Sequence, residues 1–277
     1  MRDMRGSGVR GEARDGRAVS ARTTTRAEAS TRACTTRCAA ARAAAAGVTA
    51  AVLAVTLAAC GGSAATGKDA GKARGDSPAR KLDPTRVPGV GDPLQQKIPR
   101  DARQVVAVYG QGENSAEATV RLYTKRGPNW HEDRSWPAHN GRKGWTPDHK
   151  EGDKRSPVGV FTLSDAGGVL PAPDAKLPYT NSADFTPPSY WPKKTRHDFD
   201  HVIAVNYNRV KGTSPLDPTR PQGQSKGGSI WLHMDHGSGT SGCVSLPKSG
   251  MEYLLRTLDP DKQPAVVMGD KAALAAR

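Results

Sequence analysis

One cysteine lies downstream of residue 60, in the stretch LHMDHGSGTSGCVSLP at positions 232–247. Two histidines, His233 and His236, precede Cys243, and glycine and small hydroxyl residues fill the interval. A thiol becomes a nucleophile when a base or a cation beside it favours the thiolate. His233 is the candidate base, and Gly242 would allow its own amide and that of Cys243 to converge as an oxyanion hole.

Spacing alone leaves three interpretations of Cys243 open. It is a nucleophile, a small core residue, or a zinc ligand together with Asp235 and the two histidines. A nucleophilic thiol would need its base held in one orientation. The hydroxyl groups of Thr240 and Ser241, or a backbone carbonyl, are the candidates to orient the ring of His233.

The elements that must position these residues are mostly strands. Apolar runs rich in β-branched or alternating residues predict strands at 105–109, 118–124, 159–163, 201–207, 229–234, 243–247 and 265–269. His233 would then lie toward the end of one strand and Cys243 at the start of the next. One helix is predicted, opened by a Ser249–Glu252 capping box and continued by apolar residues at helical spacing to Leu258. The pattern predicts a mainly β domain with one or few helices.

Residues 164–200 are rich in proline and lack periodicity. A loop of this length in a small domain is usually a binding loop or a lid, and the alternative is a poorly ordered insertion. Its aromatic residues, Tyr179, Phe185, Tyr190 and Trp191, favour a packed lid.

The aromatic residues also delimit the folded part of the chain. All 14 Phe, Trp and Tyr residues fall between Tyr109 and Tyr253. Since a core needs large apolar side chains, we predict a folded domain over 101–269, followed by a tail over 270–277. About 170 residues can bury a core without disulfide bonds.

The first hundred residues have the composition of a leader and a tether. An apolar run at 43–59 follows several arginines and ends in Leu57-Ala58-Ala59-Cys60, which resembles the lipobox of bacterial lipoproteins. The resemblance implies a leader over 1–59, lipidation of Cys60 and an extracytoplasmic protein anchored to the membrane. An uncleaved membrane anchor is the alternative. Gly, Pro, Ser and charged residues dominate 60–100, which we predict to be a flexible linker.

The formal net charge of +14 does not indicate nucleic-acid binding. Residues 1–59 carry +6 and residues 60–100 carry +4, which leaves +4 of mixed sign for 101–277. The chain has no basic helix and no basic sheet pattern studded with aromatic residues. An anionic polymer of the cell envelope is the better candidate partner.

Two sequence blocks resemble the L,D-transpeptidases of the YkuD family. That family carries a His and then Ser/Thr-x-Gly-Cys, which His233 and Thr240-Ser241-Gly242-Cys243 match. Its second block, with Gly-Asp-x-x-Thr-Pro-x-Gly, is similar to EGDKRSPVGVF at 151–161. The resemblance covers roughly 101–269 and implies a β-sandwich catalytic domain without metal or cofactor.

The resemblance also implies a chemistry. Cys243 would attack a peptidoglycan stem peptide, His233 would move the proton, and the thioacyl-enzyme would pass its acyl group to the amine of a second stem. Carbapenem-type β-lactams, which acylate the family, would then inhibit the protein. An L,D-carboxypeptidase on the same scaffold and a non-catalytic wall-binding lipoprotein are the alternatives.

The chain departs from the family pattern at two positions. Many members carry Ser-His-Gly-Cys-x-Arg, where this chain has Ser241 in place of the second His and Ser245 in place of the Arg. His236 is outside the motif, and its neighbour Asp235 favours a solvated loop pair, with a contact to substrate as the alternative. The Glu151-Gly152-Asp153 segment is predicted to form a turn with a structural role.

Overall fold

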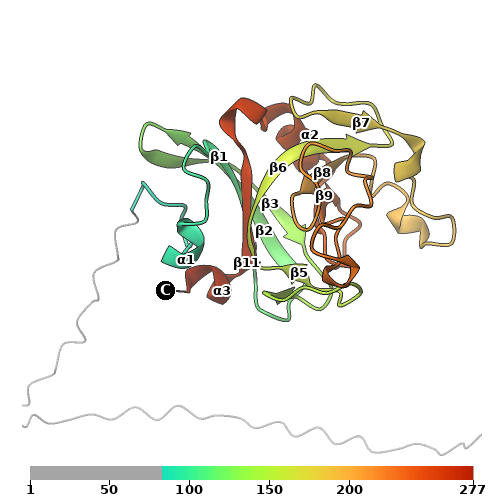
Figure 1. Cartoon of the computed structure of the whole chain (residues 1–277), viewed down its shortest axis with the longest axis horizontal. Helices are drawn as coiled ribbons and strands as arrows, with labels where there is room; N and C mark the ends of the chain where they lie inside the picture. The colour runs from blue at the N-terminus through green and yellow to red at the C-terminus, as the bar shows by residue number, and fades with distance from the viewer. Residues whose placement is uncertain (1–82, 277) are drawn as a thin grey trace, which may run out of the picture. The chain divides into compact units, whose positions relative to one another are not determined.

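The computed structural model describes residues 83–276, so the predicted leader, Cys60 and residues 61–82 lie outside the described part. Three short helices accompany eleven strands (Figure 1). The helices are α1 (Asp92–Gln95), α2 (Lys248–Thr257) and α3 (Lys271–Ala275). The strands are β1 (Gln104–Gly110), β2 (Glu117–Arg126), β3 (Asn129–His139), β4 (Trp145–Thr146), β5 (Ser156–Pro157), β6 (Gly159–Gly168), β7 (Tyr179–Asn181), β8 (Val202–Val205), β9 (Trp231–Met234), β10 (Val244–Leu246) and β11 (Ala265–Asp270).

Nine of the strands form one sheet that closes on itself. Their order is β11-β1-β2-β3-β10-β9-β8-β6-β7, and β11 also pairs with β6. Because β7 lies beyond that closing pair, eight strands make the ring and β7 extends it on the outside. Opposite parts of the ring face each other across one core, as the layers of a sandwich do. The mainly β prediction with few helices is therefore confirmed.

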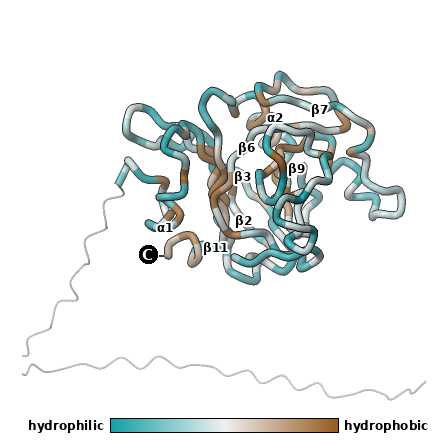
Figure 2. Tube along the Cα trace, viewed as in Figure 1, coloured by the Kyte–Doolittle hydropathy of each residue, from teal (hydrophilic) through white to brown (hydrophobic). Residues whose placement is uncertain are grey.

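Strand alternation divides the apolar residues between the inside and the outside of the ring. Val106 and Val108 of β1 belong to the main core, whereas Val105 and Ala107 face a second cluster. Both sides of β1 are therefore buried, which explains its continuous apolar run. Figure 2 shows the apolar residues gathered along the central strands and the hydrophilic ones along the outer loops.

The second cluster corrects two predicted boundaries. Val87, Val90 and Ile98, from the segment assigned to the linker, are 1%, 6% and 7% exposed and pack in it. Leu274 of α3, from the segment assigned to the tail, is fully buried in the same cluster. The amide of Gly91 donates to the carbonyl of Leu274 at 2.7 Å, so the segments that flank the predicted domain close over one end of it. The folded part therefore extends beyond 101–269 on both sides.

The predicted helix near residue 250 begins earlier than its capping box implied. Pro247 is the N-cap of α2 and no side chain caps the helix, so Ser249 lies inside its first turn. The φ of Pro247, −55°, suits the switch from β10 to the helix, and its carbonyl accepts from the amides of Gly250 and Met251 at 2.8 and 3.1 Å. The apolar face is as predicted, since Met251, Leu254 and Leu255 are fully buried.

Strand β3 is the longest strand and its sequence pattern does not reveal it. Most of its side chains are exposed or half-buried, and it contains Pro137. Its pairing with β2 along ten positions makes it a strand, which no apolar alternation signals. Within residues 83–276, no helix has both the length and the apolar character required to cross a membrane.

Candidate active site

Strands β9 and β10 bring Cys243 and His233 to one face of the sheet. The two strands are parallel neighbours, with Ser245 opposite His233. Cys243 precedes Ser245 by two residues, so its side chain shares the face of Ser245 and His233 when the alternation continues. Leu232 and Val244, which alternate with these residues, face the main core. Both residues therefore lie on the outer face of the ring.

The ring of His233 is held by the backbone beside it. Its Nδ1 lies 2.8 Å from the carbonyl oxygen of Met234. Because a carbonyl only accepts, Nδ1 carries the proton and the neutral ring keeps its lone pair on Nε2. The ring of Phe199 packs edge-on at 5.3 Å. Burial lowers the pKa of His233 to about 4, so the imidazole is neutral at physiological pH. Of the candidate groups to orient the ring, a backbone carbonyl takes the role, and neither predicted hydroxyl does.

The thiol of Cys243 is half-buried and protonated in the resting structure. Its Sγ donates to the carbonyl of Ser229 at 3.4 Å. Burial raises the pKa of Cys243 to about 11. Ser229 adopts a left-handed backbone conformation with φ of 51°, and Arg220 donates to its hydroxyl at 2.5 Å. Such backbone is strained for a residue with a side chain and concentrates at functional sites. No pattern in the sequence identifies Ser229.

The turn before Cys243 is fastened by Thr240. The amide of Gly242 donates to the hydroxyl of Thr240 at 3.1 Å, and that hydroxyl donates to the carbonyl of Cys243 at 2.6 Å. The amide of Gly242 is thus engaged, contrary to its predicted place in an oxyanion hole. The amide of Cys243 remains the candidate donor. Ser241 is exposed and accepts from Arg142 at 3.3 Å.

The second sequence block supports the same turn. Ser156 is fully buried and donates to the carbonyl of Gly242 at 2.7 Å. Just before it, the carboxylate of Asp153 accepts from the amides of Lys150 and Arg155 at 2.9 and 2.8 Å. The predicted turn at Asp153 is confirmed, and the hydroxyl of the block reaches the nucleophile motif directly.

Ser245, which stands at the family's arginine position, belongs to a hydrogen-bond network around the carboxylate of Asp235. Ser245 donates to Asp235 Oδ1 at 2.7 Å, and His139 Nδ1 lies 2.8 Å from the same oxygen. Burial acts to raise the pKa of Asp235, but the bonds from Ser245 and His139 outweigh it and hold that pKa below the usual value. Asp235 is therefore a carboxylate anchored beside the strand of His233. It is therefore not a member of the solvated loop pair with His236 that the sequence predicted.

His236 also departs from its predicted role. Its side chain is only 9% exposed and its Nδ1 lies 2.9 Å from Asp198 Oδ2. Asp198 comes from the predicted lid, and sequence analysis did not identify it. The adjacent aromatic residue in HDFD was the only available signal that this segment packs inward.

The predicted lid covers this face of the sheet. Its first five residues belong to β6, and the rest contains β7 and two 3-10 helices, Ala183–Phe185 and Lys193–Thr195. Phe185 is buried against Trp231 of β9, and Phe199 lies 5.2 Å from the same ring. Cys243 packs at the edge of this cluster. The packed-lid prediction is confirmed for Phe185 and for the partly buried Tyr179, whereas Tyr190 and Trp191 are 84% and 37% exposed.

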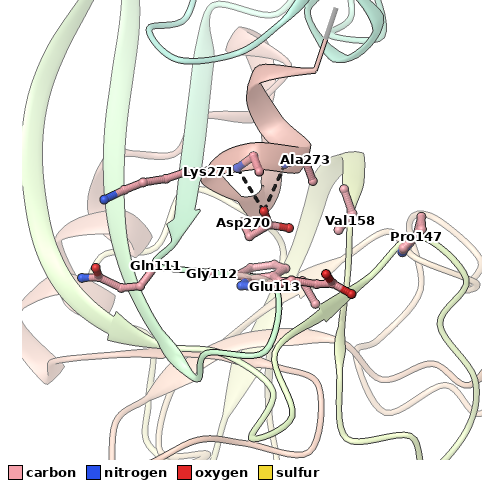
Figure 3. A pocket seen from close by; sticks show the side chains of 10 residues that line it. Gln111, Gly112, Glu113, Pro147, Val158, Asp270, Lys271 and Ala273 are labelled. Atoms are coloured by element: carbon pink, nitrogen blue, oxygen red, sulfur yellow. Dashed lines mark hydrogen bonds between the residues drawn. The ribbon is translucent and has the colours of Figure 1, made fainter.

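Two other features of the described part lie apart from this site. Within residues 83–276, no group of three or more His, Cys, Asp or Glu side chains is arranged to hold a metal ion. A hollow of about 460 Å³ lies beside α3, and neither Cys243 nor His233 lines it (Figure 3). Asp270 at its wall already accepts from the amides of Ala272 and Ala273.

The sequence profile of the YkuD L,D-transpeptidase catalytic domain matches residues 114–268, more than half of the chain. The chain belongs to the YkuD family. This YkuD match spans both sequence blocks and every strand of the ring except β1, which precedes it, although the profile ends within β11. The protein therefore has the L,D-transpeptidase catalytic fold.

Comparisons with individual proteins add less. No curated protein matches the chain. Among solved structures, that of Bd1075 from Bdellovibrio bacteriovorus is similar, with 15% sequence identity and a TM-score of 0.37. The similarity covers 68% of this YkuD protein and 54% of Bd1075.

Proposed function

We propose that the protein is a cysteine-dependent L,D-transpeptidase that cross-links peptidoglycan stem peptides through a thioacyl-enzyme. The observation that carries the proposal is the placement of His233 on β9 and of Cys243 directly before the neighbouring strand β10, on the same face of the sheet, with Nδ1 of His233 anchored to the Met234 carbonyl. This tautomer leaves Nε2 as the base. Membership of the family supplies the substrate class.

The pKa values of the pair define its resting form. A thiol with a pKa near 11 and an imidazole with a pKa near 4 form a neutral resting pair, with no preformed thiolate–imidazolium ion pair. The thiolate would form only as the sulfur attacks, because the proton then passes to Nε2 of His233. A neutral resting thiol would also be protected from oxidation outside the cell.

Each step conserves protons and bonds. The Cys243 sulfur bonds to the carbonyl carbon between the L-configured centre and the D-residue, and His233 receives the thiol proton. The carbon–nitrogen bond then breaks, and His233 returns this proton to the departing D-amino acid. An acceptor amine attacks the thioester, the carbon–sulfur bond breaks, and the thiol is restored through His233. The amide of Cys243 would stabilise the oxyanion of each tetrahedral intermediate.

The proposal includes a location. The lipobox-like Leu57-Ala58-Ala59-Cys60 and the composition of the following residues suit a lipoprotein whose catalytic domain faces the cell wall. A membrane-anchored enzyme that acts on an immobile polymer needs a linker long enough to bring its catalytic domain to the polymer. If the segment between Cys60 and residue 83 is a flexible linker, as its composition predicts, its length of about 20 residues would provide a root-mean-square span of roughly 25 Å.

The test compares three variants of the purified protein. With disaccharide-tetrapeptides, wild type should form cross-linked dimers, detected by mass spectrometry, and a carbapenem-type β-lactam should add its mass to Cys243. Cys243→Ala should do neither, and His233→Ala should be acylated slower by several powers of ten. His236→Ala should stay within about tenfold of wild type, since it lacks a role in proton transfer to the substrate.

Each outcome discriminates. Cleaved stems without dimers would assign L,D-carboxypeptidase activity. Acylation of His233→Ala at the wild-type rate would remove His233 as the base. If wild type neither acylates nor forms any stem product, the enzyme proposal is wrong.

A further inference from the structure

The resting thiol of Cys243 has a neighbour that the proposed mechanism does not use. Its Sγ donates to the carbonyl oxygen of Ser229 at 3.4 Å, and a carbonyl accepts from a thiol but repels a thiolate. Burial raises the pKa of Cys243 to about 11 and outweighs the amides of Trp231 and of Cys243 itself, which act to lower it. Because the thiol proton passes to His233 in the proposed reaction, the contact with Ser229 belongs to the resting form.

Ser229 directs its carbonyl at the thiol through an unusual backbone conformation. Its φ of 51° is left-handed, and a residue with a side chain stays in that region only when its surroundings hold it there. Ser229 lies near the end of the loop between β8 and β9, residues 206–230. The next residue, Ile230, is fixed, since its side chain packs in the main core and its carbonyl accepts from the amide of Val205 at 2.9 Å. The backbone torsions of Ser229 therefore decide where its carbonyl points.

Arg220, from the same loop, holds Ser229 in this conformation. Its guanidinium donates to Ser229 Oγ at 2.5 Å and to the carbonyls of Asp217 and Thr219 at 3.3 and 3.2 Å. Gly228 leaves room for the guanidinium, since a Cβ there would lie 2.0 Å from Arg220 Nε. A planar guanidinium presents its donors in fixed directions, so it can bind several acceptors at once. Arg220 thus connects the middle of the loop to the residue whose carbonyl faces the thiol.

The charged and titratable groups around the sulfur come from three elements. His233 of β9 lies on the same face of the sheet, and the charge of Asp198 from the lid acts to raise the pKa of Cys243. Arg220 of the β8–β9 loop is connected to the sulfur through Ser229. A nearby cation favours the thiolate, whereas a hydrogen-bond acceptor favours the thiol. Removal of Arg220 should therefore raise the pKa of the thiol if its charge matters and lower it if its hold on Ser229 matters.

We propose that Arg220 and Ser229 are positioning residues for Cys243, in which Arg220 holds Ser229 in its left-handed conformation and the carbonyl of Ser229 then fixes the resting thiol. This inference rests on the proposed function for its role in catalysis. Its effect on the thiol itself is measurable without turnover.

The test measures the reactivity of the thiol against pH. The full-length variants are alkylated with iodoacetamide between about pH 7 and pH 11, and the reaction is followed on the peptide that contains Cys243. Ser229→Gly keeps the carbonyl and adopts a φ of 51° without strain, but it lacks the hydroxyl that Arg220 binds. Arg220→Met keeps a long side chain and removes both the charge and the donors. Acylation by a carbapenem-type β-lactam is measured on the same samples.

The expected result is a shift of the alkylation profile to lower pH. Without the bond between Arg220 and Ser229 the carbonyl can leave the thiol, so the midpoint should fall by roughly 0.5–1 pH unit in each single variant. At about pH 8 alkylation should then be roughly three- to tenfold faster, with an unchanged plateau at high pH. The double variant should match either single variant, since both changes break the same contact. Acylation should instead fall by about threefold or more, because the sulfur is no longer held in one place.

Lys211→Met is the matched control. Lys211 is an exposed cation of the same loop, so its replacement removes an equal charge and should give the alkylation profile of wild type. A midpoint that rises in Arg220→Met would show that Arg220 acts through its charge. An unchanged midpoint, with or without a higher plateau, would show that the contact does not govern the thiol.

Either of these two outcomes would overturn the proposal, and so would two single shifts that add in the double variant. If Arg220→Met does not fold, Ser229→Gly decides, because glycine tolerates the backbone conformation. Normal alkylation of wild type without acylation or any stem product would instead disprove the proposed function. The alkylation midpoints of the variants would still decide whether Arg220 and Ser229 position the thiol.

Discussion

Cys243 and His233 acquire their properties from burial more than from each other. The lid and the sheet exclude water from both groups, which raises the pKa of the thiol and lowers that of the imidazole. Both shifts favour the neutral forms. The same environment thus keeps the thiol protonated and the imidazole of His233 unprotonated at neutral pH.

The buried imidazole predicts how stability depends on pH. The pKa of His233 is depressed from 6.5 to about 4, so its contribution to folding is present above 6.5 and is lost as the pH falls toward 4. In His233→Gln this loss is absent. Between pH 7 and pH 4, the difference in unfolding free energy between wild type and His233→Gln should shift by about 3 kcal/mol in favour of the variant. Urea titrations at several pH values measure it, and parallel pH curves would contradict it.

The turn that precedes Cys243 is held in one conformation by its neighbours. The hydroxyl of Thr240 donates to the carbonyl of Cys243, and the hydroxyl of Ser156 donates to the carbonyl of Gly242. Gly242 itself has a φ of +149°. A Cβ at Gly242 would lie 3.1 Å from the carbonyl oxygen of Arg155 and 3.3 Å from Ile230 Cδ1. The turn therefore admits only glycine without movement of its neighbours.

Gly242→Ala tests this element. We expect a loss of about 1–3 kcal/mol in stability from the backbone conformation. Acylation of Cys243 should fall by more than tenfold, since the amide of Cys243 moves with the turn. Gly112→Ala is the control, because no atom lies within 4 Å of a Cβ placed there and its rates should be those of wild type. Normal acylation of Gly242→Ala would show that the turn tolerates a side chain.

At the scale of the whole molecule, the segment before β1 is part of the fold. Val87, Val90 and Ile98 share a cluster with Leu274 of α3. A chain that begins at residue 83 should retain the stability of the longer chain. One that begins at residue 101 should lose on the order of 5 kcal/mol, since burial of each such side chain contributes about 1.5–3 kcal/mol. Chemical denaturation of the two truncated chains measures this, and equal midpoints would mean that the cluster contributes nothing.

The anchor is tested on the full chain. If Cys60 is lipidated, the mature protein lacks residues 1–59 and fractionates with membranes, because two acyl chains hold a protein stably at a bilayer. Cys60→Ala should retain its leader and lack the lipid mass. Membrane fractions that contain both forms equally, each with its leader, would disprove the lipobox assignment.

The local sequence alone determined the strands and the helix whose apolar pattern depends only on neighbouring residues. Apolar or alternating runs predicted β1, β2, β6, β8 and β9, and the resemblance of the motif to a known family singled out Cys243 and His233, since spacing alone left the role of the thiol open. The helical spacing of its apolar residues likewise predicted α2. These features depend on residues that are close together in the sequence, so they can be predicted from the sequence alone.

Tertiary structure decided what depends on distant partners. Strand β3 exists because β2 pairs with it, and the segments before β1 and after β11 fold because they bury one another's apolar residues. Asp198 meets His236 only after the lid closes over β9, and no spacing encodes that contact. Burial set the protonation of Cys243 and His233, and burial is a property of the assembled fold. The sequence thus singled out Cys243 and His233, while packing against the lid sets the pKa of each so that both are neutral at physiological pH.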